Sequence, residues 1–443
     1  MNKVNFKELK PQIRQVWILS LPAILTQITT IAMQYIDSAM VGSLGANASA
    51  SIGLVSTTTW LLSGITYAVA AGFSVQVAHN IGGNRDAQAR NVVRHGLVTA
   101  LILSGLLCLF GISISKMLPI WLGGDVTIQA DATKYFFVYA LMIPFSQMNS
   151  LNASFLQCCG DMLTPSILNA VMCGLDVLFN AIFIPSFGVM GAGIGTALAC
   201  AVVSLLMTYR CCLKNPRLRL NRKEKGTFEK NILIQALKIG TPVALEETAM
   251  CGAMVASTVI IAPLGTVAIA AHSFAVTAVG LCYMPGFGIG TAATTLVGRS
   301  IGAGEKKLAK CYGNICIAMG AAFMAMTACL MIIFCPFVFR MLTPDENVRI
   351  LAAQVLRIGL LAEPLYGVSI VAAGALRGTG DTLVPSILNL ISIWGVRLGL
   401  AVLLVGKLGL HGMWVAMATE LCVRGLLMAY RQKTTKYYDK VRI

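Results

Sequence analysis

Charged residues are scarce in this 443-residue chain. They make up 12% of it, while 57% of the residues are hydrophobic and the mean hydropathy is +0.77. Soluble domains carry about 25% charged residues, so this composition excludes an ordinary soluble domain. Apolar runs of the ~20 residues needed to cross a bilayer recur along the whole length. We therefore expect an all-α integral membrane protein.

Further absences narrow the function. The chain has no Gly-x-x-x-x-Gly-Lys-Ser/Thr phosphate loop, which argues against an ATP-driven pump. Its fourteen cysteines lie mostly in apolar runs without the spacing of a disulfide or metal framework, so we expect buried thiols. The polar start leads into an apolar stretch too long for a cleavable signal peptide. No polar segment exceeds a short loop, which argues against a receptor or scaffold. We expect neither an enzyme nor an organic cofactor.

The apolar runs predict twelve membrane spans. Their approximate bounds are 15–42, 50–81, 92–114, 132–158, 163–186, 189–212, 231–262, 267–298, 311–336, 348–376, 383–406 and 409–431. Several are longer than a bilayer requires, which permits tilt or bending. Pro364 marks one expected bend.

The net charge of +16 is distributed unevenly across the predicted topology. With the amino terminus on one side, the loops and tails on that side hold 25 of the 34 Lys and Arg residues, and the opposite loops hold five. Basic residues favour the cytoplasmic side of a membrane protein, so both termini should be cytoplasmic. The basic stretch from Lys214 to Lys230 should lie along anionic lipid headgroups. We expect no nucleic-acid partner.

The chain repeats itself after about 220 residues. Pro165 to Asn169 returns letter for letter as Pro385 to Asn389, and Gly160-Asp161 returns as Gly380-Asp381. A slip of one residue then aligns Gly188 with Gly409. The sequence therefore predicts two lobes, residues 1–220 with spans one to six and residues 221–443 with spans seven to twelve. Because each lobe has an even number of spans, their pseudo-two-fold axis should run along the membrane normal.

Ionisable residues inside spans are costly and mark functional sites. Asp37 lies in the outer half of the first span, and Asp176 and Asn180 lie four residues apart on one face of the fifth. If these spans pack together, the three side chains and the Thr196 hydroxyl offer hard oxygen ligands for a small cation. The alternative is that Asp37 and Asn180 bridge helices structurally.

Other polar residues within spans allow alternative assignments. Glu246 and Glu247 in the seventh span and Glu363 in the tenth form a possible site in the second lobe, or they pair with Arg397 or Arg357. Glu420 and Arg424, four residues apart, predict a structural ion pair. The candidates for a substrate cavity are the polar or aromatic residues Gln34, Tyr35, Tyr283, Met284, Tyr366 and Arg397.

At these residues the chain resembles the multidrug and toxic compound extrusion (MATE) family, prokaryotic type. The resemblance rests on three segments: Asp37 to Gly42, Gly188 to Thr196, and Ala373 to Asp381. Each segment is modest alone, but their order within a twelve-span duplication is specific, and the match covers essentially the whole chain.

The resemblance implies a V-shaped pair of six-helix lobes and a cation or proton site in the first lobe. Asp37 and Thr196 match that site, whereas Asp176 and Asn180 occur in swapped order. Members with a site in the second lobe use acidic residues of the seventh and tenth spans. Here Glu246 and Glu363 lie about one turn earlier than usual, and Tyr366 occupies the tenth-span acidic position.

The expected function is a multidrug efflux antiporter. It would export amphipathic, often cationic, toxic compounds by alternating access, coupled to Na⁺ or H⁺, with Na⁺ held by Asp37, Asp176, Asn180 and Thr196. The alternative is a flippase for a lipid-linked saccharide or another amphiphile, although such relatives often have fourteen spans and a basic cleft. We expect a monomer in the bacterial inner membrane, surrounded by lipids.

Overall fold

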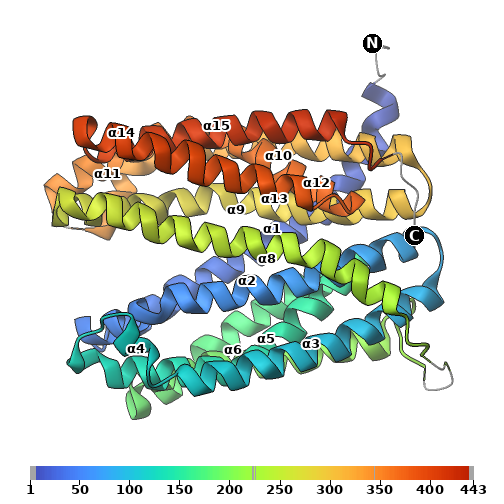
Figure 1. Ribbon diagram of the computed structural model, residues 1–443, viewed down its shortest axis with the longest axis horizontal. Coiled ribbons are helices and arrows are strands. Elements are labelled where there is room, and N and C mark those ends of the chain that lie inside the picture. The colour runs from blue at the N-terminus through green and yellow to red at the C-terminus, as the bar shows by residue number, and fades with distance from the viewer. Residues whose placement is uncertain (1–5, 222–223, 225, 344, 439–443) are drawn as a thin grey trace. The chain divides into compact units, whose positions relative to one another are not determined.

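The protein is described by a computed structural model that covers residues 6–221, 224, 226–343 and 345–438, with backbone only for residues 6–8 (Figure 1). Some of the basic residues that were counted for topology lie outside the described part, namely Lys3, Arg222, Lys223, Lys225, Lys440 and Arg442. Every secondary-structure element in the described part is helical, which confirms the all-α prediction.

Two compact units make up the chain. The amino-half unit is Ile28–Ala244, and the carboxy-half unit is Met1–Gln27 together with Leu245–Ile443. The helices α1 (Phe6–Gly42) and α8 (Lys230–Ile261) therefore each contribute one part to each unit. The predicted division at residue 220 concerns the sequence repeats and stays a prediction.

The helices of the amino-half unit follow the second part of α1. They are α2 (Ala46–Gly82), α3 (Asp86–Ile114), the short α4 (Leu118–Trp121), α5 (Val126–Cys158), α6 (Leu163–Phe187), α7 (Val189–Tyr209) and the π-helix η1 (Arg210–Lys214). The central helix is α5, which packs against α2, α3 and α7. A buried core at these contacts includes Phe73, Val93, Phe155 and Met207.

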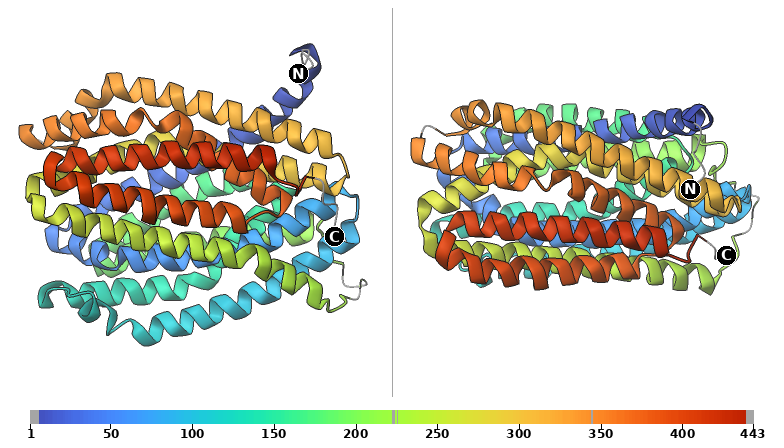
Figure 2. Two further views of the ribbon diagram at one scale, coloured as in Figure 1. Left: turned by 45° about the horizontal axis from the view of Figure 1, so that its top comes forward. Right: turned by 90° about the horizontal axis from the view of Figure 1, so that it is seen from above.

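The carboxy-half unit contains the second part of α8 and the helices that follow it. They are η2 (Ala262–Leu264), α9 (Thr266–Gly302), α10 (Lys306–Leu342), α11 (Glu346–Leu360), α12 (Glu363–Thr379), α13 (Leu383–Leu390), the π-helix η3 (Ile391–Leu398), α14 (Gly399–Leu408) and α15 (Leu410–Thr434). Here α12 is central and packs against α9, α10 and α15. Figure 2 shows from two directions that neighbouring helices within each unit run lengthwise beside one another.

Each of the twelve predicted spans falls on a described helix or on consecutive helices. Ten described helices are long and apolar enough to cross a membrane, and the pair α11–α12, bent by 54°, makes an eleventh. The predicted bend therefore lies where Pro364 was expected to cause it, because α12 begins at Glu363 directly after the break. The remaining span, 132–158, lies in α5, where Gln147 and Asn152 lower the hydropathy but are fully buried.

The two sequence repeats fold alike in local detail. Gly188 and Gly409 both have a φ of 57°, and Gly160 and Gly380 have φ values of 85° and 86°. Left-handed backbone favours glycine because it has no Cβ. The packing is also repeated, since α5 contacts α2, α3 and α7 as α12 contacts α9, α10 and α15. The duplication seen in the sequence is therefore a duplication of structure.

The one-residue slip between the repeats coincides with a π-helix. The segment α6 runs from Leu163 to the turn at Gly188 as one α-helix, whereas its counterpart from Leu383 to Gly409 is one residue longer and contains η3. A π-helix accommodates an extra residue by wider i→i+5 turns, and such segments are frequent at functional sites. The inserted residue thus changes which side chains face the interior after Asn389.

Part of the basic stretch between the repeats binds its own unit. Arg217 donates from Nε to Asp86 Oδ1 at 3.0 Å and from Nη2 to the Ile81 carbonyl at 2.9 Å. Arg90 holds Glu224 through two hydrogen bonds of 2.8 and 2.6 Å. The Arg90 guanidinium lowers the pKa of the Glu224 carboxyl. These bonds fasten the connecting segment to the turn between α2 and α3.

Candidate functional site

The predicted amino-half cluster forms around one amide group. Asn180 of α6 donates from Nδ2 to Asp37 Oδ1 of α1 at 2.8 Å and to Asp176 Oδ2 at 3.2 Å. Asp176 and Asn180 are fully buried, and Asp37 is half-buried. The spacing of four residues places Asp176 and Asn180 on one helical face. The structure thus brings together three of the four residues that the sequence singled out.

An apolar contact holds α1 and α6 together beside this cluster. Val41 lies one turn after Asp37, and Ile184 lies one turn after Asn180. Both belong to a small buried core with Val189. Because residues four apart share a helical face, this apolar core lies on the same side of α1 and α6 as the Asp37–Asn180 hydrogen bond.

A glycine lets α7 approach the cluster. A Cβ at Gly195 would collide with the side-chain oxygen of Asn180 and would lie 3.0 Å from its backbone nitrogen. Only glycine leaves that space free, so Gly195 sets the distance between α7 and Asn180. In the sequence, Gly195 stands out only as one of the glycines in the segment Gly188 to Thr196, which carries the family resemblance.

Thr196 is adjacent to the cluster but does not bind it. Its hydroxyl donates to the Ala192 carbonyl of its own helix at 3.1 Å. Sequence reasoning missed Tyr135 of α5, which lies within electrostatic range of both Asp37 and Asp176. No motif pointed to Tyr135, because its placement depends on the packing of α5 against α7 beside Gly193.

The carboxyl groups of the cluster have no positively charged partner in the described part of the chain. In the described part of the chain, no ion pair involves Asp37 or Asp176. The buried atoms Asp176 Oδ1 and Asn180 Oδ1 have no hydrogen-bond partner. Hard oxygen donors of this kind suit Na⁺, and adjacent carboxylates also suit a shared proton. The donor set therefore fits a small monovalent cation or a proton.

The carboxy-half acidic residues do not gather at one point. Glu246 of α8 accepts from Ser386 Oγ at 2.8 Å and from Asn389 Nδ2, both on α13. Glu363 is 1% exposed, and neither of its carboxylate oxygens has a hydrogen-bond partner. Glu247 is half-buried and lies within electrostatic range of Arg377. Among the described residues, no hydrogen bond or ion pair joins Glu246 or Glu247 to Glu363.

Arg397 takes part in a different cluster from the one expected. It donates from Nη2 to Glu420 Oε2 at 2.6 Å, and Arg424 Nε lies 3.0 Å from Glu420 Oε1. The predicted pair of Glu420 and Arg424 is confirmed, but Arg397 does not pair with Glu246 or Glu363. The Arg424 Cζ atom lies over the Tyr366 ring, 5.1 Å from the ring centroid. The centroids of the Tyr366 and Tyr283 rings are 5.6 Å apart.

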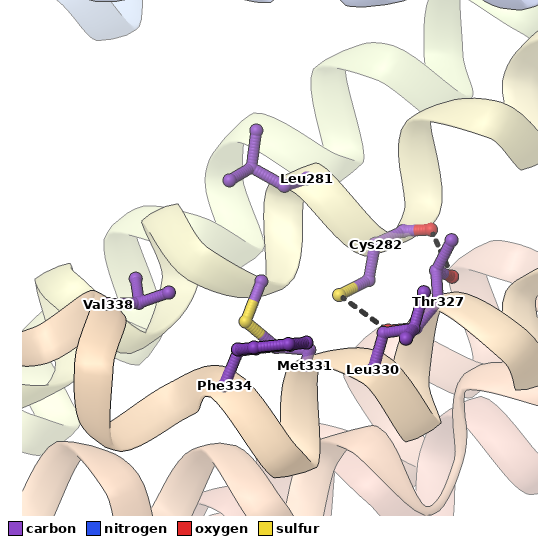
Figure 3. A pocket seen from close by; sticks show the side chains of 7 residues that line it. All are labelled: Leu281, Cys282, Thr327, Leu330, Met331, Phe334 and Val338. Carbon is purple, nitrogen blue, oxygen red and sulfur yellow. Dashed lines mark hydrogen bonds between the residues drawn. The ribbon is translucent and has the colours of Figure 1, made fainter.

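The remaining cavity candidates differ in exposure. Gln34 and Tyr35 of α1 are exposed, and Met284 of α9 is half-buried. A cavity of ≈ 230 Å³ lies between α9 and α10, lined by apolar side chains with Cys282 and Thr327 (Figure 3). Its rim includes Leu281 and Phe334, which are 46% and 54% exposed. None of the six predicted cavity residues lines it.

Known proteins match this chain over nearly its whole length. The family model MatE matches twice, at residues 22–182 and 242–403, which reproduces the offset of the sequence repeat. A protein of Thermotoga maritima named "Probable multidrug resistance protein NorM" is 29% identical, over 95% of this chain and 92% of its own length. "Multidrug resistance protein NorM" of Burkholderia vietnamiensis is 27% identical, over 93% of this chain and 92% of its own length.

The fold also matches solved structures. One, described as "Outward-facing conformation of a multidrug resistance MATE family transporter of the MOP superfamily", has a TM-score of 0.91 at 21% sequence identity and covers 95% of each chain. A structural match at this level of sequence identity shows that the two chains share a fold. It agrees with the predicted all-α membrane fold of twelve helices in two lobes.

Proposed function

Because this chain belongs to the MatE family, we propose that it is a multidrug efflux transporter that exports amphipathic, often cationic, compounds in exchange for Na⁺ or H⁺. The names of the NorM relatives support the export of drugs or other toxic organic compounds. The proposal that export is coupled to a cation is argued from Asp37, Asp176 and Asn180 of this chain.

One observation carries the coupling proposal. Asp37 and Asp176 meet at a single amide inside the membrane, with no described cationic partner. Two ionised carboxylates in a medium of low dielectric repel each other strongly. A bound proton or Na⁺ reduces that repulsion, so the cluster is suited to bind and release one cation in each transport cycle.

Coupling requires the cation to bind one facing of the transporter better than the other. A ligand shifts a conformational equilibrium only by its difference in affinity between the two states. Asp37 and Asn180 come from different helices, so a movement of α1 against α6 would change the ligand set. The cluster would load a cation from outside, release the drug there, and lose the cation to the cytoplasm.

The location follows from composition and charge. The apolar helices and the excess of Lys and Arg on one side support a multi-pass protein of the bacterial plasma membrane with both termini cytoplasmic. Arg397 and Arg424 both pair with Glu420, so these two arginines do not favour the flippase alternative.

The test is transport in vesicles that contain the purified protein. Uptake or release of a fluorescent organic cation is followed under a pH gradient and, separately, under a Na⁺ gradient. We expect movement under at least one gradient. If the dye moves under neither gradient, the antiporter proposal is wrong.

Asp37→Asn tests the site within the same assay. The change preserves the size of the side chain but removes its charge, so gradient-driven export should fall to the level of protein-free vesicles. Asp125→Asn is the matched control, because Asp125 caps α5 by accepting from Thr127 N at 2.8 Å and lies outside the cluster. Undiminished export by folded Asp37→Asn protein would remove Asp37 from the mechanism.

A further inference from the structure

The carboxy-half unit contains a charged cluster that the first repeat lacks. Arg397 of η3 and Arg424 of α15 both pair with the Glu420 carboxylate. With the one-residue slip between the repeats, Glu420 and Arg424 correspond to Ala199 and Val203 of α7, which are fully buried. Both α7 and α15 pack against the central helix of their unit. Because apolar side chains can fill these positions, the charges indicate a role other than packing.

The cluster has one more positive charge than negative charge. In the described part of the chain, neither arginine forms an ion pair with an acid other than Glu420. Arg397 donates from Nε and Nη2 to Glu420 Oε2 at 3.2 and 2.6 Å. A guanidinium group has five N–H donors, so three donors of Arg397 have no acceptor among the described residues. Arg397 is also the most exposed member of the cluster, with a side chain that is 17% exposed.

Two further nitrogen atoms near Arg397 lack a hydrogen bond. Arg424 Nε lies 3.0 Å from Glu420 Oε1, but the two groups are not aligned for a hydrogen bond. His272 of α9 lies within electrostatic range of Arg397, and its Nδ1 atom is buried without a partner. Buried polar atoms are normally bonded to protein, water or a ligand. Guanidinium donors without acceptors suit a ligand that accepts hydrogen bonds and carries negative charge.

Aromatic rings adjoin these charged groups. The Tyr366 ring lies beneath Arg424, and Tyr366 is within electrostatic range of Arg397. The Tyr283 ring makes edge contacts with the rings of Tyr366 and Phe287, at centroid distances of 5.6 and 5.9 Å. All three rings are half-buried. They present an apolar surface to an organic group whose charged end meets the arginines.

We propose that Arg397 binds the carboxylate of an amphipathic aromatic compound while the rings of Tyr366 and Tyr283 contact its apolar part. Arg424 binds Glu420 as well, so the Glu420 carboxylate does not fully neutralise Arg397. Because the site rests on the proposed export function, it extends the exported compounds from organic cations to zwitterions and aromatic acids.

The charge and shape of the site favour a carboxylate over other anions. The single excess positive charge matches one carboxylate, whereas a phosphate monoester carries about two negative charges at neutral pH. The planar fork of a guanidinium group matches the two oxygens of a carboxylate, and a spherical chloride ion offers no such match. Acetate should therefore displace a bound aromatic acid at concentrations at which chloride does not. Equal displacement by chloride would overturn the assignment to a carboxylate.

The test compares two xanthene dyes that differ by one methyl group. One dye has a free benzoate group and is a zwitterion, and the other is its methyl ester and is a cation. Fluorescence polarisation measures the affinity of each dye for the purified full-length protein in lipid nanodiscs. Arg397→Gln should weaken binding of the acid dye by about tenfold, because it removes charged hydrogen bonds to the carboxylate. Binding of the ester dye should be nearly unchanged.

A second variant guards against misfolding of Arg397→Gln. Arg424→Gln should also weaken binding of the acid dye, because Glu420 then neutralises Arg397. Neither substitution strands a charge, since each leaves one arginine paired with Glu420, so both proteins should fold. Lys407→Gln is the matched control, because it removes an exposed positive charge from α14 outside the cluster. It should bind both dyes as the parent protein does. Unchanged affinity for the acid dye in both arginine variants, or an equal loss for the two dyes, would overturn the proposal.

The outcomes separate this site from the proposed function. If binding of the acid dye depends on Arg397 but neither dye moves under a pH or Na⁺ gradient, the site stands and the antiporter proposal is wrong. If the ester dye moves under a gradient but Arg397→Gln and Arg424→Gln bind the acid dye as the parent protein does, the antiporter proposal stands and the carboxylate site is wrong.

Discussion

The two units hold their most buried carboxylates in opposite electrostatic settings. Asp176 of the amino-half unit shares an amide with Asp37 and has no described cationic partner. Glu420 of the carboxy-half unit lies between Arg397 and Arg424. The Asp176 carboxylate is thus available to a mobile ion, whereas the Glu420 carboxylate is neutralised by two arginines of the protein. The duplication preserved the helical framework while the charges diverged.

The one-residue insertion helps to explain this divergence. Counted back from Gly409, the counterpart of Asp176 is Arg397, which lies in the π-helix η3. The counterpart of Asp37 is Ser257, whose hydroxyl donates to the Ala253 carbonyl of its own helix at 2.8 Å. Both positions of the amino-half carboxylates therefore lack an acid in the second repeat.

The largest expected effect comes from removing the carboxylate of Glu420. Glu420→Gln leaves two arginines inside the membrane unit without a countercharge, which should destabilise the protein by about 3–5 kcal/mol. Thermal unfolding in detergent measures the loss. Asp176→Asn is the matched comparison, and it should leave stability nearly unchanged because no cation is stranded. Equal losses in the two variants would contradict the electrostatic difference between the units.

The repeated Gly-Asp turn gives the second comparison. Asp381 is 1% exposed and accepts from Arg431 at 2.6 and 2.8 Å and from Thr435 at 3.1 Å. Asp161 precedes α6 and accepts from the backbone N–H of Thr164, in the first turn of that helix, at 3.0 Å. Asp381→Ala should cost about 1.5–3 kcal/mol, because it breaks hydrogen bonds to a charged group. Asp161→Ala should cost about 1 kcal/mol, as a lost cap does. Equal losses in chemical unfolding would show that the two turns are not used differently, and the reverse order would contradict the stronger role of Asp381.

A single methyl group tests how tightly the amino-half cluster is built. Gly195→Ala should destabilise the protein by about 1–3 kcal/mol through overpacking and should weaken cation binding, because the new Cβ displaces Asn180. The residue at the equivalent place in the second repeat is Ala416, which is fully buried. Ala416→Gly should cost only about 1 kcal/mol in helix propensity. Unchanged cation binding by the Gly195→Ala protein would mean that binding does not depend on the position of the Asn180 side chain.

The smallest effect concerns the connecting segment and depends on pH. Arg90 lowers the pKa of Glu224, so this pair contributes fully above the ordinary glutamate pKa of ~4.3 and loses its contribution as the pH falls through the lowered value. At pH 7, Glu224→Gln should make residues 215–229 more accessible to limited proteolysis by an acid-tolerant protease. Below the lowered pKa, the variant and the parent protein should be cleaved alike. A difference that persists in acid would rule out this ion pair as the cause.

Much of the amino-half cluster could be predicted because its signals are local. An acid in an apolar span is costly wherever the helix lies, and four-residue spacing fixes a common face for Asp176 and Asn180. Tyr135 could not be predicted, because nothing in its own segment distinguishes it from a packing residue. Thr196 was named from its type and position, and the structure directs its hydroxyl to Ala192.

The sequence by itself determined the membrane class, the twelve helices, the duplication and the presence of uncompensated acids, since hydropathy, spacing and repetition are properties of the chain. The tertiary structure decided which acids meet which partners. Glu246 bonds Ser386 of α13 and not the segment of Glu363. Arg397 lies in the π-helix η3, after the inserted residue, and from there it binds Glu420. Distances between helices depend on packing at positions such as Gly195, and no local pattern encodes them.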